Sequence, residues 1–262
     1  MGVVNTTPDS FSDGGRYAAA DAAIAHGLAL MGAGADILDV GGEATNPRAV
    51  PVDAATELAR VLAVIAALVA AGARVSIDTT KAAVARAAIA AGASIVNDIS
   101  GGLFDADMAA VLAASDAAYI AGHVRGRTLA DVFGAEGAPP TWQEVASELA
   151  ARVAALPPAV RARTWVDPGI GFGKGSDPAG NLSLIAHAGD LARITGRPVA
   201  IGASRKRFLR VLLEAAAIRP TEAALDDATV GASLAAVHAG ATMLRVHDVA
   251  RMRAALVSFT NG

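Results

Sequence analysis

Short apolar runs rich in β-branched residues alternate with longer alanine-rich stretches along the whole chain. The short runs predict strands at residues 2–4, 36–40, 74–77, 94–96, 117–120, 164–166, 198–201 and 242–246. The longer stretches predict helices at residues 18–32, 52–71, 81–91, 105–114, 142–156, 178–192, 226–239 and 249–259. Strict alternation favours parallel strands, and eight strand–helix pairs favour closure into a (β/α)8 TIM barrel over an open doubly wound sheet.

One segment breaks the alternation. Residues 125–141 follow the fifth predicted strand, and their glycines and prolines predict irregular structure. An ordered lid and a flexible connection both fit this composition. No shift in composition marks a second domain, so we expect a single α/β domain over residues 1–262.

Composition narrows the class of protein. With 262 residues, of which 53% are hydrophobic and 18% charged, the chain has the length of one such barrel. A formal net charge of −3 without a long basic run argues against sequence-independent binding of nucleic acid. The absence of cysteine excludes disulfides and thiolate metal sites and is compatible with a reducing cytosol. No apolar run reaches 18 residues, so we expect a soluble, cytoplasmic protein without a membrane span.

The first predicted strand ends abruptly at Asn5, and a polar loop follows as far as Gly15. The loop is too polar to bury and too long for a tight turn. Its Asn, Asp, Ser and Thr side chains are of the types that bind metal ions and phosphate oxygens. A plain solvated connection would have a similar composition.

Polar side chains close nearly every predicted strand at the same end. They are Asn5, Asp39 with Glu43, Asp78, Asn97 with Asp98, His123, Asp167, Ser204 with Arg205 and Lys206, and Arg245 with His247 and Asp248. In parallel barrels the loops at these strand ends converge on one mouth, where active sites form. The sequence therefore predicts that these side chains face one cavity.

Asp78 and Asp167 each emerge from an apolar strand. A buried carboxylate is costly unless it accepts hydrogen bonds, and a fused heterocycle with amino and ring N–H donors would supply them. The alternative is that each carboxylate caps the following helix, which suits Asp78 before Thr79 better than it suits Asp167 before Pro168.

Cationic residues gather at two neighbouring strand ends. Arg245 and His247 are two positions apart and share one side of an extended strand, so together with Lys206 they could hold an anion of several charges. By itself, Lys206 also fits a solvated surface lysine. His123 fits a structural histidine as well as a ligand contact. The glycine-rich segment around Phe172 matches a dinucleotide motif poorly and is better interpreted as a loop that offers this ring for stacking.

The polar loop Asn5-Thr-Thr-Pro-Asp-Ser-Phe-Ser-Asp-Gly-Gly15 resembles the first signature of the dihydropteroate synthases. The segment Asp36-Ile-Leu-Asp-Val-Gly-Gly-Glu-Ala-Thr-Asn-Pro47 is similar to the second signature. Further similar segments follow in family order at residues 76–81, 96–102, 167–174, 204–206 and 245–248. On these seven segments the chain is identified as a member of the family.

The resemblance implies a (β/α)8 barrel, commonly a homodimer, that joins 4-aminobenzoate to 6-hydroxymethyl-7,8-dihydropterin diphosphate and releases pyrophosphate in folate biosynthesis. The residues implied for the pterin ring are Asp78, Asn97, Asp167 and Lys206. Those implied for the diphosphate and its Mg²⁺ are Asn5, Arg245 and His247. Those implied for aminobenzoate, with two mobile loops, are Phe11, Thr45, Pro47, Phe172 and the Ser204 to Arg207 stretch. The implied path is SN1-like, with a pterin methylene cation that the arylamine attacks.

The chain departs from the family pattern at three places. Asn46 stands where the second loop usually has arginine, and Arg48 follows two residues later. Arg207 replaces a usual serine beside the implied aminobenzoate carboxylate, which a guanidinium could bind or crowd. The fifth strand ends Ala121-Gly-His-Val where the family typically has Met-His-Met, which leaves a smaller wall near the pterin. The departures bear on aminobenzoate affinity and on the response to sulfonamide analogues.

Two other interpretations keep the pterin residues. A methyltetrahydrofolate methyltransferase would use Asp78, Asn97 and Asp167 but would have no use for a diphosphate site at Arg245 and His247. A pterin-binding paralogue without turnover is suggested by the altered second loop.

Overall fold

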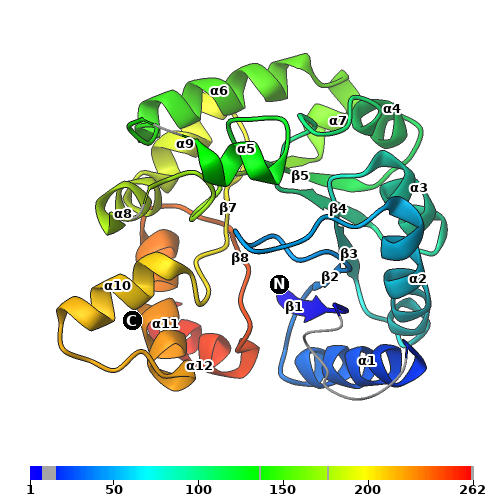
Figure 1. Ribbon diagram of the computed structural model, residues 1–262, viewed down its shortest axis with the longest axis horizontal. Helices are drawn as coiled ribbons and strands as arrows, with labels where there is room; N and C mark the ends of the chain where they lie inside the picture. Colours follow the sequence, from blue (N-terminus) through cyan, green and yellow to red (C-terminus); the bar gives the residue numbers. More distant parts are fainter. Residues whose placement is uncertain (8–15, 136, 176, 261–262) are drawn as a thin grey trace.

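The computed structural model describes residues 1–7, 16–135, 137–175 and 177–260, which form the predicted closed barrel of parallel strands (Figure 1). The strands are β1 Gly2–Asn5, β2 Leu38–Gly41, β3 Val75–Asp78, β4 Ile95–Asp98, β5 Ala118–Gly122, β6 Thr164–Asp167, β7 Ala200–Ile201 and β8 Met243–Leu244. Strands β1 to β6 pair in chain order, and β7 pairs with β8. Parallel bridges from Val166 to Val199 and from Gly2 to Val246 join the two groups and close the barrel.

Helices form a ring around the strands (Figure 1). They are α1 Arg16–Gly32, α2 Ala54–Ala70, α3 Ala82–Ala90, α4 Met108–Ala113, α5 Leu129–Gly134, α6 Trp142–Ala155, α7 Pro158–Ala162, α8 Pro178–Ala186, α9 Ala188–Thr195, α10 Arg207–Ala215, α11 Glu222–His238 and α12 Val249–Thr260. Among these residues no helix is long and apolar enough to cross a membrane.

The helix predictions need correction at several places. The helix expected over residues 178–192 is divided at His187 into α8 and α9. The pattern also failed to predict the short helices α5 and α7, and α10, which buries Phe208 and Leu209. The spacing of the apolar residues in α10 fits one face of an amphipathic helix and could have indicated it.

The irregular segment after β5 is largely ordered where the structure describes it. The Thr128 side chain accepts a hydrogen bond from Asp131 N and caps α5. Thr141 and Glu144 form a reciprocal capping box at the start of α6. An ordered lid is therefore the better of the two interpretations for this segment.

The barrel interior is built in two layers. The lower layer is an apolar plug, to which Ile37, Ile95, Ala118, Ile120, Trp165, Ala200 and Met243 contribute. Side chains two positions apart on a strand share a face. The residues two positions after Ile37, Ile95, Trp165 and Met243 are Asp39, Asn97, Asp167 and Arg245. The sequence thus sets a polar layer directly on the apolar plug, at the carboxyl ends of the strands.

Small residues make room in this polar layer. Gly41 and Gly202 follow Asp39 and Ala200 by two positions and face the same cavity. A Cβ atom at Gly41 would lie 3.5 Å from the Cβ of Asp78, and one at Gly202 would lie 3.9 Å from Oδ2 of Asp167. Any larger side chain would fill the space beside these carboxyl groups.

Candidate active site

Arg245 joins two carboxyl groups across the mouth of the barrel. Its Nε donates to Oδ2 of Asp39 at 2.6 Å, and its Nη2 donates to Oδ2 of Asp78 at 2.7 Å. Asp39 is fully buried, and the Asp78 and Arg245 side chains are 14% and 24% exposed. Removal of one partner would leave an uncompensated buried charge, so the three side chains act as one unit.

Asn97 and Asp167 complete the floor of the site. Asn97 Nδ2 donates to Oδ2 of Asp39 at 3.0 Å, and Asp167 Oδ1 accepts from Gly169 N at 2.7 Å. The Asn97 side-chain oxygen and Oδ2 of Asp167 have no donor among the described residues. The buried Oδ1 of Asp39 and the hydroxyl of Ser76 also lack a partner there. The floor therefore keeps unused acceptors for a ligand rich in N–H groups.

Burial shifts the pKa values of this site. Burial raises the pKa of Asp78 to about 7, although the Arg245 guanidinium lowers it, and raises the pKa of Asp167. Burial lowers the pKa of Lys206 to about 8, against the opposing influence of Asp167. Burial also works against the charge of Arg245, but the carboxylates of Asp39 and Asp78 outweigh it and raise its pKa. Strongly shifted groups that converge in a cleft are typical of active sites.

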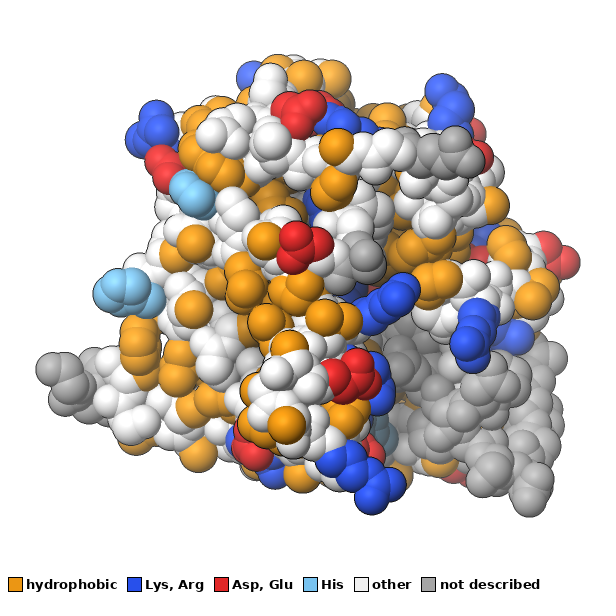
Figure 2. All heavy atoms as spheres, turned by 60° about the vertical axis from the view of Figure 1, so that its left-hand side comes forward, with side chains coloured by type: hydrophobic (Ala, Val, Ile, Leu, Met, Phe, Trp, Pro, Cys, Tyr) orange, Lys and Arg blue, Asp and Glu red, His pale blue; other side chains and the backbone are white. Residues whose placement is uncertain are grey.

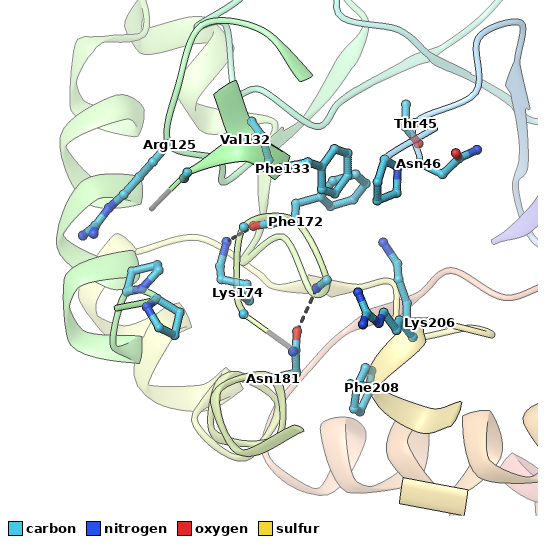
Figure 3. Close-up of a pocket in the computed structure, with 18 of the residues that line it drawn as sticks. Thr45, Asn46, Arg125, Val132, Phe133, Phe172, Lys174, Asn181, Lys206 and Phe208 are labelled. Carbon is cyan, nitrogen blue, oxygen red and sulfur yellow. Dashed lines mark hydrogen bonds between the residues drawn. The ribbon is translucent and has the colours of Figure 1, made fainter. Parts of the chain in front are cut away.

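Lys206 and Phe172 meet above this floor. The Lys206 Nζ lies 3.9 Å from the centroid of the Phe172 ring, close enough for a cation–π interaction. Both line a cavity of about 590 Å³, to which the second loop contributes Thr45, Asn46 and Pro47. Figure 3 shows Phe133 of α5 beside Phe172, with a distance of 5.9 Å between the ring centroids. The cavity thus has aromatic and cationic walls.

The second loop, which follows β2 and carries Thr45, Asn46 and Pro47, is held in place by ion pairs at its base. Lys81 Nζ donates to Glu43 and to the fully buried Glu57, both at 2.6 Å, and Glu43 also accepts from Val52 N. Within the loop, Asn46 Oδ1 accepts from Arg48 N at 2.9 Å. The loop therefore reaches the cavity from a fixed base.

Ser204 and His247, which follow β7 and β8, contact each other. The distance from Ser204 Oγ to His247 Nδ1 is 2.9 Å. Burial and the charges of Arg245 and Arg205 together lower the pKa of His247 to about 4, so the imidazole is neutral at pH 7. The role of His247 beside Arg245 in anion binding stays a prediction. Arg207, the first residue of α10, is exposed and lines the cavity.

Asn5 ends β1 and is exposed at the mouth, opposite Gly41 in the strand register. No group of three or more histidine or acidic side chains in the described ranges could hold a metal ion. The single amide oxygen of Asn5 fits Mg²⁺ only if most of the coordination comes from ligand phosphates and water, which is the usual arrangement for this ion. Phe11 lies outside the described residues.

Two acidic residues next to the site residues do not face the cavity. Asp98 points away from the barrel interior and accepts from Ser100, Gly102 and the Tyr119 hydroxyl. Asp248 accepts from Arg251 N at the start of α12. Both are structural.

Hydrogen bonds also decide between the alternative roles of Asp78 and His123. Asp78 does not cap α3, because Thr79 accepts from Lys81 N and Asp105 accepts from Ala82 N. His123 is fully buried between Glu148 and Lys174, so it is a structural histidine. Sequence reasoning placed Asp39 at the rim but did not include it among the site residues, although its spacing from Ile37 could have indicated this role.

The raised pKa of Asp78 has a consequence for stability. The folded protein keeps a proton on this carboxyl up to about pH 7, whereas the free side chain ionises near 3.8. Its contribution to the free energy of unfolding therefore decreases as the pH rises from about 4 to about 7. We expect the stability of Asp78→Asn relative to the wild type to increase between pH 4 and pH 8, because only the wild type carries this titrating carboxyl group, while the loss of the partner of Arg245 affects the variant at both pH values.

Urea unfolding at the two pH values tests this expectation. The exposed Asp21→Asn on α1 is the control, and its difference from the wild type should be the same at both. An equal difference for Asp78→Asn at pH 4 and pH 8 would contradict the shifted pKa.

Comparison with known proteins identifies the family. Residues 1–247 match the family described as pterin binding enzyme. The chain is 44% identical over 257 residues to the dihydropteroate synthase of Mycobacterium leprae, covering 95% of this chain and 88% of the relative. The Xanthomonas albilineans dihydropteroate synthase structure with 4-aminobenzoic acid has a TM-score of 0.89 and 39% identity, covering 100% of this chain and 91% of the other. The same enzyme with 7,8-dihydropteroate has a TM-score of 0.84 and 39% identity, covering 100% and 92%. The chain therefore belongs to the pterin-binding enzyme family and, within it, to the dihydropteroate synthases.

Proposed function

We propose that this protein condenses 6-hydroxymethyl-7,8-dihydropterin diphosphate with 4-aminobenzoate to give 7,8-dihydropteroate and pyrophosphate. The observation that carries the proposal is the half-buried group formed by Asp78, Asn97, Asp167, Lys206 and Arg245 at one end of the barrel. The Xanthomonas relatives hold aminobenzoate and dihydropteroate, the second substrate and the product of this reaction.

The pterin ring fits the unused hydrogen-bonding capacity of the floor. A pterin carries an amino group and ring N–H groups, which would donate to Asp78, Asn97 and Asp167. Lys206 would donate to its carbonyl oxygen or ring nitrogen. N–H donors stabilise an ionised carboxylate, so pterin binding would lower the pKa of Asp78 and leave it negatively charged during the reaction.

The diphosphate would lie above the ring, near Arg245, His247 and Asn5. Arg245 stays charged and His247 offers an N–H donor, both suited to phosphate oxygens. An anion beside His247 would also offset the positive charges that lower its pKa. Mg²⁺, held by the diphosphate and Asn5, would neutralise part of the negative charge of the leaving group.

The chemistry requires charge stabilisation more than a strong base. The bond between the pterin methylene carbon and the diphosphate oxygen breaks, and its electron pair leaves with the diphosphate, towards Arg245 and His247. The ionised Asp78 stabilises the methylene cation. The nitrogen lone pair of the neutral arylamine then forms the C–N bond to the methylene carbon, and the resulting ammonium group loses its proton to water or to the released pyrophosphate.

Aminobenzoate would enter from the cavity side. Phe172 offers an aromatic face for the ring, and Thr45 and Pro47 line the same cavity. The family resemblance adds Ser204, which pairs with His247. The exposed guanidinium of Arg207 is suited to the carboxylate in place of the arginine that Asn46 replaces. Phe11, in the first loop, completes the residues proposed for this substrate.

Assembly and location follow the family resemblance. We propose a homodimer. Figure 2 shows hydrophobic side chains spread over one face of the molecule. Leu182 of α8, Ile194 of α9 and Leu212 of α10 are each at least 37% exposed and could contribute to an interface. The cytoplasmic location stays a prediction.

The direct test is to mix the purified protein with the pterin diphosphate, Mg²⁺ and 4-aminobenzoate and to measure pyrophosphate release. We expect release that depends on aminobenzoate, and loss of pterin diphosphate binding by at least about tenfold in Lys206→Ala. Arg210→Ala on the exposed side of α10 is the control and should keep both properties. Tight pterin binding without release would favour the paralogue without turnover, and full activity in Lys206→Ala would contradict the site.

A second prediction concerns Arg207. We expect Arg207→Ser to raise the KM for aminobenzoate about fivefold to tenfold, because a carboxylate loses a charged partner, and to leave the Kd for pterin diphosphate unchanged. The matched control is Arg210→Ser. A lower KM in Arg207→Ser would show that the guanidinium crowds the substrate.

A further inference from the structure

Lys174 is a buried cation that the proposed reaction does not use. It is one of three lysines in the chain and is only 2% exposed. It follows Phe172 by two positions in the loop between β6 and α8. A buried ammonium group is unfavourable unless all its donors are satisfied, so the surroundings of Nζ indicate its role.

Three acceptors surround the Lys174 Nζ. They are the main-chain oxygen of Phe172 at 2.9 Å, the main-chain oxygen of His123 at 3.2 Å and Nδ1 of His123 at 3.1 Å. An ammonium group has three N–H donors, one for each acceptor. This arrangement requires an unprotonated Nδ1, and His123 then donates its Nε2 proton to Glu148 at 2.9 Å.

The loop that Lys174 fastens would otherwise be free to change conformation. Gly169, Gly171, Gly173 and Gly175 all have positive φ angles, from 62° to 82°. Such a run of glycines loses much conformational entropy when it is ordered. A Cβ atom at Gly169 would lie 2.1 Å from the main-chain oxygen of His123, so the loop passes too close to β5 for any larger residue.

Phe172, whose carbonyl oxygen accepts from Lys174, provides an aromatic wall of the cavity. Lys174 holds the carbonyl of Phe172, while the ring of Phe172 lies under Lys206 and beside Phe133 (Figure 3). We propose that Lys174 is a positioning residue for the aminobenzoate site, which holds the Phe172 ring in its stacking position by binding the carbonyls of Phe172 and His123. The inference rests on the proposed function of this cavity.

The network continues behind the loop and gives it a rigid base. Glu148 of α6 also accepts two hydrogen bonds from Arg125, at 3.0 and 2.6 Å. Arg125 begins the segment that carries α5 and itself lines the cavity. One chain of hydrogen bonds therefore joins the two walls of the cavity, through Lys174 and His123.

Lys174 can lose its charge near neutral pH. Burial lowers its pKa to about 7, and among the charged groups that face it Asp167 and Glu148 favour the ammonium, whereas Arg152 and Lys206 oppose it. His123 stays neutral, because burial and Lys174 lower its pKa to about 3. The third donor is therefore lost as the pH rises through about 7.

The test compares Lys174→Met with the wild type by two measurements. Steady-state kinetics should show the KM for aminobenzoate raised about tenfold at pH 6, with the Kd for pterin diphosphate within about twofold of the wild type. The KM of Lys174→Met divided by the KM of the wild type should fall as the pH rises to 9, because the deprotonated Lys174 of the wild type has one N–H donor fewer for its three acceptors. Equal weakening of both substrates would overturn the proposal.

Amide hydrogen exchange gives a measurement that does not need the reaction. Exchange at residues 169–175 should become faster in Lys174→Met, while residues 200–208 keep wild-type rates. Failure of pyrophosphate release by the wild type would refute the proposed function and would leave this exchange result unaffected.

A second variant tests the proposal even if Lys174→Met does not fold. Glu148→Gln, a partly exposed position on α6, keeps an acceptor for His123 but removes the charge, and should raise the KM for aminobenzoate about twofold to threefold. No change in KM or in exchange for either variant would overturn the proposal.

Discussion

The ion pairs between Arg245, Asp39 and Asp78 are the interaction on which the rest of the site depends. Three charged side chains from different strands lie at the carboxyl end of the barrel, where water cannot fully solvate them. Each is tolerable only because the others are present. The apolar plug beneath them and the glycines between them fix their positions, so the closed barrel is what makes this arrangement possible.

The same arrangement is costly for stability and useful for catalysis. Burial raises the pKa of Asp78 and lowers that of Lys206, so both are less completely ionised in the folded protein than in water. A substrate that supplies N–H donors and phosphate charge would restore the ionised forms. Binding energy is then used to create the charges that the reaction needs, in a site built before the substrate arrives.

Much of this could be predicted from the sequence, and strand periodicity explains the limits. The alternation of elements gave the barrel, and the polar residues at strand ends gave its mouth. Adjacent positions such as Asn97 and Asp98 looked equal in sequence, but only Asn97 faces the interior, because successive side chains on a strand point to opposite sides. The partners of His123 and Lys174 lie 25 and 51 residues away, beyond any local pattern.

The measurement that tests the central claim most directly is the affinity of Asp39→Asn for pterin diphosphate, by calorimetry on folded protein. Asp39 fixes Arg245 and Asn97 and keeps the charge of the site balanced. The account predicts binding at least about tenfold weaker than in the wild type. An affinity within twofold of the wild type would contradict it, because the charged groups would then work independently of the pair that holds them together.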